Sequence, residues 1–156
     1  MTPLEVRAAL LTRPRDAFRL TLAGEAAGEP MNARVAVACA IRNRVLRPGW
    51  WGRDYASVCL KAWQFSCWFE KNANSARLYT LAESVLTGAI APADAAMLDP
   101  LSAIVDGVMS GVIPDSVSGA THYVTKALLA VAPPVWSINR TPCIVVGHHA
   151  FFKDVA

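Results

Sequence analysis

Apolar residues recur through the first half of the chain at three- and four-residue spacings, the pattern of helices that bury one face. Between Asp16, the expected N-cap, and Gly28, the expected stop signal, the pattern predicts one such helix. Residues 31–46 predict the next, and their many small side chains indicate burial on more than one side. A Thr-Pro-Leu-Glu capping sequence opens a shorter helix over residues 3–12. The chain therefore begins as a helical protein.

The helical pattern is then interrupted twice. Residues 48–53 contain adjacent tryptophans between glycines and predict a turn, and residues 63–69 alternate aromatic with polar side chains, which favours an extended segment or loop. The Ala-rich residues 90–97 fit either a helix or a loop, and Asp99 followed by proline predicts a helix start just after them. Helices are expected over residues 54–60, 76–87 and 100–109.

The last third of the chain has a different character. Residues 119–124 and 143–147 predict short strands, and a loop containing Pro133, Pro134 and Trp136 separates them. Helices followed by a small extended region indicate an α+β fold, mostly helical, whose β part comes mainly from the C-terminal third. With no repeat, low-complexity segment or linker, residues 1–156 are expected to form a single domain.

Composition narrows the classes of protein. The 156 residues are 54% hydrophobic and 17% charged, which excludes disorder and supplies a core. The net charge of +3 is too small for the basic stripe of a nucleic-acid binder. The first twenty residues do not resemble a secretory signal, and the apolar runs are too short to span a bilayer, so a soluble protein is expected.

The four cysteines show no metal-binding spacing. Free thiols are expected, although Cys59 and Cys67 are close enough to form a disulfide outside the cytosol. The histidines, His122, His148 and His149, could bind zinc together with a glutamate, but adjacent histidines on a strand point to opposite faces. Ordinary hydrogen-bonding roles, with no metal and no cofactor, are the expectation.

Glu25 and Glu29 are the candidates for acid/base chemistry. At a spacing of four residues they share one face if their helix reaches Glu29, and a solvated acidic helix end is the alternative. Glycosidases with two carboxyls place them on opposite sides of the scissile bond, about 5–9.5 Å apart, which neighbours on one helix face do not easily achieve. A single carboxylate that acts first as acid and then as base needs no such partner. The spacing thus favours an intramolecular transfer over hydrolysis.

Aromatic and amide side chains predict a carbohydrate groove. The chain has five tryptophans, and Gln64 and Ser66 lie among aromatics, where they could bind hydroxyl or acetamido groups. Trp63 and Trp136 are the best groove candidates because each stands in a loop-like stretch. Core packing is the alternative for any of these indoles.

Several sequence blocks resemble, in the same order, those of the spore-cortex-lytic cell wall hydrolases, the SleB-like catalytic domain. The resemblance covers roughly residues 17–152. The blocks are Ala23-Gly24-Glu25-Ala26-Ala27-Gly28-Glu29-Pro30, Val35-Ala36-Val37, Asn43-Arg44-Val45, Gln64-Phe65-Ser66, Gly119-Ala120-Thr121-His122-Tyr123, Trp136 and Gly147-His148-His149-Ala150-Phe151.

The resemblance implies a lysozyme-like α+β fold, a peptidoglycan substrate and lytic transglycosylase chemistry without a metal. By position, Glu25 matches the family's catalytic glutamate, and Glu29 matches a second acid with a supporting role. Gly24, where a larger residue is common, and Ala33-Arg34, where Gly-Gln is usual, depart from the family's pattern. The positions expected in or beside the cleft are Gln64, Phe65, Ser66, His122, Tyr123 and His149.

The expected activity is cleavage of the bond between N-acetylmuramic acid and N-acetylglucosamine, giving 1,6-anhydro products. A muramidase that hydrolyses this bond is the first alternative. A non-enzymatic wall-binding or phage structural module and a zinc amidase are the others. Because no signal peptide and no separate wall-binding domain are recognised, we expect a phage or prophage lysin. Such a monomer would be made in the cytoplasm and act on glycan strands after a holin-type release, or within a virion.

Overall fold

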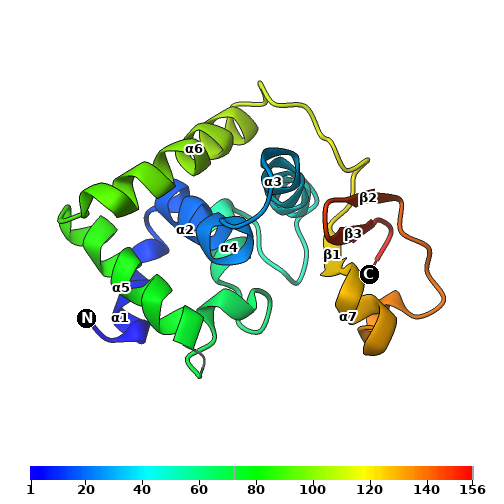
Figure 1. Ribbon diagram of the computed structural model, residues 1–156, viewed down its shortest axis with the longest axis horizontal. Coiled ribbons are helices and arrows are strands. Elements are labelled where there is room, and N and C mark those ends of the chain that lie inside the picture. The colour runs from blue at the N-terminus through cyan, green and yellow to red at the C-terminus, as the bar shows by residue number, and fades with distance from the viewer. Residues whose placement is uncertain (72, 156) are drawn as a thin grey trace.

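The structure is a computed structural model that describes residues 1–71 and 73–155 (Figure 1). Within these residues the chain is a mostly helical α+β domain with one small sheet, which confirms the predicted fold class. Its helices are α1 (Pro3–Leu10), α2 (Pro14–Ala26), α3 (Met31–Leu46), α4 (Tyr55–Leu60), α5 (Ala73–Thr87), α6 (Pro92–Met109) and α7 (Lys126–Val131), with the short 3-10 helices η1 (Ser66–Trp68) and η2 (Val135–Ser137).

The helix starts at Thr2 and Asp54 are confirmed, since each side chain accepts a hydrogen bond from the backbone N–H three residues on. The predicted cap at Asp16 is wrong, because α2 begins at Pro14 and Asp16 lies in its first turn. There its carboxylate forms ion pairs with Arg13 at 2.6 Å and with Arg19 at 2.9 Å. Proline is favoured at a first helical position, which explains the earlier start.

The sixth helix differs most from its prediction. The ambiguous residues 90–97 supply its first turns, so Asp99 is not a cap and Pro100 lies inside the helix. Proline removes one helical hydrogen bond at a cost of about 3 kcal/mol. The apolar face of α6 offsets this cost, because Leu101 and Val105 are fully buried.

The sheet joins β1 (His122–Thr125), β2 (Ile144–Val146) and β3 (His149–Phe152) in the order β1-β3-β2, with both pairs antiparallel. The sequence predicted the two outer strands and missed β3, the central one, which is buried at all four positions. A tight turn at Gly147, whose φ of +56° favours glycine, reverses the chain between β2 and β3. Helix α7, which follows β1 directly, was not predicted either.

The helices and the sheet meet at α3. Figure 1 shows α1, α2, α5 and α6 on one side of α3, and the sheet with α7 on the other. Helix α2 packs on α3, α4, α5 and α6, while α3 also contacts β1 and β2. The small residues of α3 allow this close packing on two sides, since Ala36, Ala40 and the residues between them are buried. This placement brings the end of α2 near the first strand.

In the described part of the chain no single helix has the length and apolarity to cross a membrane. Helices α5 and α6 reach that length and apolarity only as a pair, which is bent by 87°. All four cysteines are free thiols, and Cys39, Cys59 and Cys67 are buried.

Candidate functional site

A cleft of about 440 Å³ lies where the helical part of the domain meets the sheet. Residues from α2, α3, η1, α5, β1, α7, η2 and β3 contribute to it. Its lining residues are Gly24, Glu25, Arg44, Gln64, Phe65, Ser66, Cys67, Phe69, Asn74, Tyr123, Val124, Thr125, Leu128, Pro134, Trp136 and His149. Of the predicted site residues, the cleft thus brings together Glu25, Gln64, Phe65, Ser66, Tyr123, Trp136 and His149.

Glu25 lies in the last turns of α2 and is partly buried. Its Oε2 accepts a hydrogen bond of 2.9 Å from the Tyr123 hydroxyl, and its Oε1 accepts a longer one of 3.4 Å from the backbone N–H of Cys67. Among the described residues that line the cleft, it is the only carboxylate. The site therefore offers one acid/base group, held from two sides.

Gly24 allows η1 to approach the helix that carries Glu25. A Cβ at this position would lie 2.6 Å from the Cβ of Cys67 and 2.8 Å from a methyl group of Leu78. Real contacts of this kind are not that short, so no larger residue fits without movement. The departure from the family's pattern at Gly24 thus has a structural reason: it brings the Cys67 amide within reach of the carboxylate.

Tyr123 comes from β1, where it pairs with Phe151 of the central strand. Burial, and next the neighbouring Glu25 carboxylate, raise the pKa of Tyr123 well above its ordinary value. The phenol is therefore protonated near neutral pH and is a hydrogen-bond donor to Glu25. Strand β1 thus positions a donor directly against the carboxylate, which only the tertiary fold could arrange.

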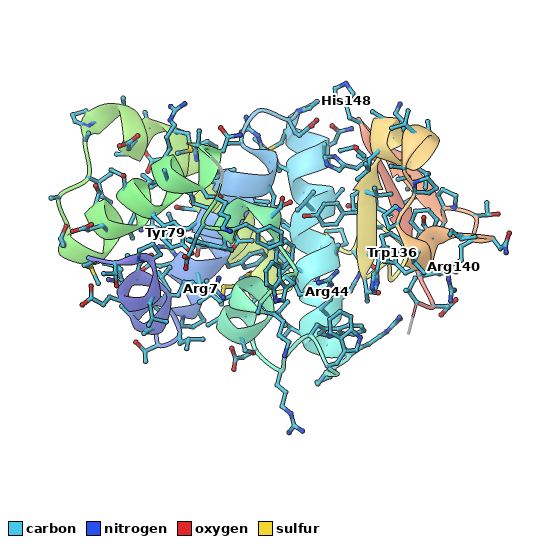
Figure 2. The ribbon with its side chains drawn as sticks, turned by 90° about the horizontal axis from the view of Figure 1, so that it is seen from below. Arg7, Arg44, Tyr79, Trp136, Arg140 and His148 are labelled. Atoms are coloured by element: carbon cyan, nitrogen blue, oxygen red, sulfur yellow. The ribbon has the colours of Figure 1, made fainter. Side chains whose placement is uncertain are left out.

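Arg44 lines the cleft from α3, between the helical part and the region that carries Trp136 (Figure 2). Its Nε donates to the Thr121 carbonyl at 2.7 Å and its Nη1 donates to Oε1 of Gln64 at 3.2 Å. The guanidinium also lies over the rings of Trp51 and Phe65, at 5.8 and 5.4 Å from the ring centroids. Burial lowers the pKa of Arg44, yet a guanidinium stays protonated in proteins.

The aromatic groove candidates differ in position. Trp136 lines the cleft and packs edge-on against Phe152 at 5.1 Å. Trp63 is not among the lining residues: it is 81% exposed and makes an edge contact of 5.5 Å with Phe69, which does line the cleft. Its φ of +65° is unusual for a bulky residue.

The predicted histidines His149 and His122 also differ in position. His149 lines the cleft near Tyr123, at 5.4 Å between ring centroids, and its buried Nδ1 has no hydrogen-bond partner among the described residues. Burial lowers the pKa of His149, against the opposite effect of the Glu29 and Glu25 carboxylates. His122 does not line the cleft and instead packs between Trp51 and Trp136, so it braces the cleft wall.

Glu29 lies beyond the end of α2, so the two acids do not share a helix face. Its Oε2 lies 3.2 Å from Nδ1 of the exposed His148. His148 lies at the top of Figure 2, well away from Arg44. Arg34 donates to the carbonyls of Glu29 and Ala27, both at 2.8 Å, and so holds the chain as it leaves α2. Glu29 and its neighbours thus fix the α2–α3 turn to the β2–β3 turn.

Several residues that line the cleft were not among the predicted site residues, including Arg44, Phe69, Asn74 and Leu128. Arg44 had a signal, since a cation inside an apolar helix that is buried on two sides needs a specific partner. The others have no local signal, because distant elements bring them to the cleft. In residues 1–71 and 73–155 no group of three His, Cys, Asp or Glu side chains could hold a metal ion.

Together these features define a mostly helical α+β domain with an aromatic-walled cleft around a single carboxylate. The family model described as Cell Wall Hydrolase matches residues 28–152, so the chain belongs to the cell wall hydrolase family. Membership supports an enzyme that acts on peptidoglycan. The match begins after Glu25 and includes the later cleft residues. No curated protein and no solved structure matches the chain, and the lysozyme-like relationship stays a prediction.

Proposed function

We propose that this chain is a peptidoglycan lytic transglycosylase that cleaves the bond between N-acetylmuramic acid and N-acetylglucosamine, with Glu25 as acid and base. The observation that carries the proposal is the environment of Glu25. This carboxylate faces a cleft large enough for sugar rings, accepts a hydrogen bond from Tyr123, and has no second carboxylate among the described lining residues.

In the first step, protonated Glu25 gives its proton to the glycosidic oxygen, and the bond from that oxygen to C1 of the muramic acid breaks. Oε2 is occupied by the Tyr123 hydroxyl, whereas Oε1 has only the long contact with Cys67. Oε1 is therefore the oxygen assigned to carry the proton. The leaving sugar departs with a new hydroxyl, and positive charge develops at C1 beside the carboxylate that has just formed.

In the second step, the C6 hydroxyl of the same muramic acid attacks C1. Its proton passes to Glu25, which restores the acid, and a 1,6-anhydro ring forms without water. The hydrogen bond from Tyr123 stabilises the carboxylate between the two steps. One carboxylate completes the cycle, whereas a two-carboxylate hydrolysis needs a partner on the opposite side of the bond.

Product analysis tests the reaction. Purified peptidoglycan is digested and the fragments are separated by mass: muramic ends lighter by one water than the reducing sugar are expected. Reducing muramic ends with no anhydro species would instead assign the chain as a muramidase. Binding of wall glycan without any cleavage would contradict an enzymatic role.

The role of Glu25 is tested with Glu25→Gln, which keeps the size of the side chain and removes the titrating proton. Turnover should fall by about 10²–10⁴-fold, the usual contribution of a general acid or base. Glu83→Gln is the matched control, because Glu83 is a surface carboxylate paired only with the N-terminus. Equal lysis by the Glu25 variant and the control would remove Glu25 from the mechanism.

A further inference from the structure

Arg44, which lines the cleft, is a buried cation with no carboxylate in ion-pair contact among the described residues. The residue is only 6% exposed. It contacts the Thr121 carbonyl, the Gln64 side chain and two aromatic rings, and the Glu25 carboxylate of the same cleft acts on it at longer range. A buried positive charge disfavours a second cation placed directly beside it, because the low-dielectric surroundings strengthen the repulsion.

Arg44 also determines which way the Gln64 amide points. A guanidinium has only donors, so the Gln64 atom that faces it at 3.2 Å must be the carbonyl oxygen. The amide nitrogen of Gln64 then points away from Arg44, and Gln64 lines the cleft. Because Arg44 occupies the amide oxygen, the Gln64 group left to bind a ligand in the cleft is the N–H donor.

The amino sugars of peptidoglycan carry either an acetamido group or, after de-N-acetylation, an ammonium group, and the two groups differ in how they can bind to this pair. An acetamido group offers a carbonyl oxygen, which accepts a hydrogen bond from the Gln64 amide. A de-N-acetylated sugar offers an ammonium group in its place, which has donors only and a positive charge. This ammonium group cannot accept the hydrogen bond that the Gln64 amide donates, and the positive charge of Arg44 repels it. Both effects oppose binding of the de-N-acetylated sugar.

We infer that the Arg44–Gln64 pair is a specificity element that selects N-acetylated glycan and rejects de-N-acetylated glycan. The inference rests on the proposed function, since it concerns a subsite of the same cleft. Arg44 is a positioning residue in it, and Gln64 is the residue that contacts the sugar.

The test compares one purified peptidoglycan in three forms: fully N-acetylated, de-N-acetylated, and re-acetylated with acetic anhydride. We expect kcat/KM to fall at least about tenfold on de-N-acetylation, as for loss of one hydrogen bond plus charge repulsion, and to recover on re-acetylation. A change below twofold would overturn the inference.

Two variants of Gln64 assign the effect to this residue. Gln64→Glu pairs with Arg44 and turns an acceptor toward the cleft, so its preference should shift at least tenfold toward the ammonium form. Gln64→Met has a similar size with neither donor nor acceptor, and should bind both forms poorly with a reduced preference. If Gln64→Glu keeps the wild-type ratio between the two glycans, the pair does not set specificity.

Binding separates this inference from the proposed function. The Glu25→Gln variant, which should not turn over, is titrated with the N-acetylated and the de-N-acetylated glycan. A tenfold weaker Kd for the de-N-acetylated strand supports the inference even if the products show hydrolysis. Equal Kd values overturn it even if anhydro products confirm the transglycosylase.

Discussion

Replacing Gly24 with alanine adds a single methyl group at the contact between α2 and η1. That methyl carbon would lie 2.6 Å from the Cβ of Cys67, 2.8 Å from Cδ2 of Leu78 and 2.9 Å from Sγ of Cys67. The Leu78 methyl and the thiol can rotate, but the Cβ of Cys67 moves only with the backbone of η1. The substitution therefore has to push η1 away from the helix.

The magnitude follows from two opposing effects. Overpacking a well-filled site typically costs about 1–3 kcal/mol. Alanine in place of glycine inside a helix returns about 0.5–1 kcal/mol. The free energy of unfolding should therefore fall by an amount between roughly 0 and 2.5 kcal/mol, with about 1 kcal/mol at the centre of the range. Because η1 carries the amide that contacts Glu25, activity should also fall, by about tenfold or more.

Urea unfolding followed by circular dichroism measures the stability, and release of soluble fragments from purified walls measures the activity. Gly28→Ala is the matched control, since a Cβ at Gly28 meets nothing within 4 Å. That control should unfold and act as the parent does. If Gly24→Ala is as stable and as active as Gly28→Ala, the close approach of η1 to α2 has no role in holding the site.

Two further predictions concern the β side of the cleft. Tyr123→Phe removes the hydroxyl that donates to Glu25 at 2.9 Å, so kcat should fall by about 10–100-fold with little change in glycan binding by the folded variant. The second follows from His122, where burial, and next Arg44 and Arg140, lower the pKa to about 4. The unfolded chain binds this proton near pH 6.5 and the native state does not. His122 therefore does not reduce the free energy of unfolding above pH 6.5. The free energy of unfolding should decline toward pH 4 by up to about 1.4 kcal/mol per pH unit.

Controls for these predictions come from the same region. Phe151, the partner of Tyr123 in the sheet, is fully buried and its ring lies 5.7 Å from the Tyr123 ring, so a kcat effect equal to that of Phe151→Leu would mean that Tyr123→Phe acts only through packing. His122→Gln should lose less stability than the parent between pH 6.5 and 4. If the His122→Gln variant and the parent lose the same stability between pH 6.5 and 4, His122 is not the group responsible.

The helices that carry the site could be predicted because their signals are local. The period of α2 and α3, the capping sequences at Thr2 and Asp54, and the short strands near residues 122 and 144 all arise from interactions between neighbours in sequence. Local signals failed where tertiary packing outweighed them. Pro100 inside α6 is such a case, since the buried face of the helix offsets a locally unfavourable residue.

The cleft residues divide in the same way. Gln64, Tyr123 and Trp136 could be predicted from motifs, and they do line the cleft. Trp63 could not be separated from them by sequence, because nothing in its neighbours predicts that the indole is exposed and outside the cleft lining. Nothing local distinguishes a histidine that braces a wall, as His122 does, from one that lines the cavity.

The sequence by itself determined the α+β class, the cell wall hydrolase family and the choice of Glu25 over Glu29 as the candidate acid/base. These depend on composition, periodicity and ordered motifs, which neighbouring residues carry. Only the tertiary structure decided that Tyr123 donates to Glu25, that Gly24 admits the Cys67 amide and that Arg44 orients Gln64. Each of these contacts joins different elements of the chain, and only the packing of these elements on one another brings the atoms together.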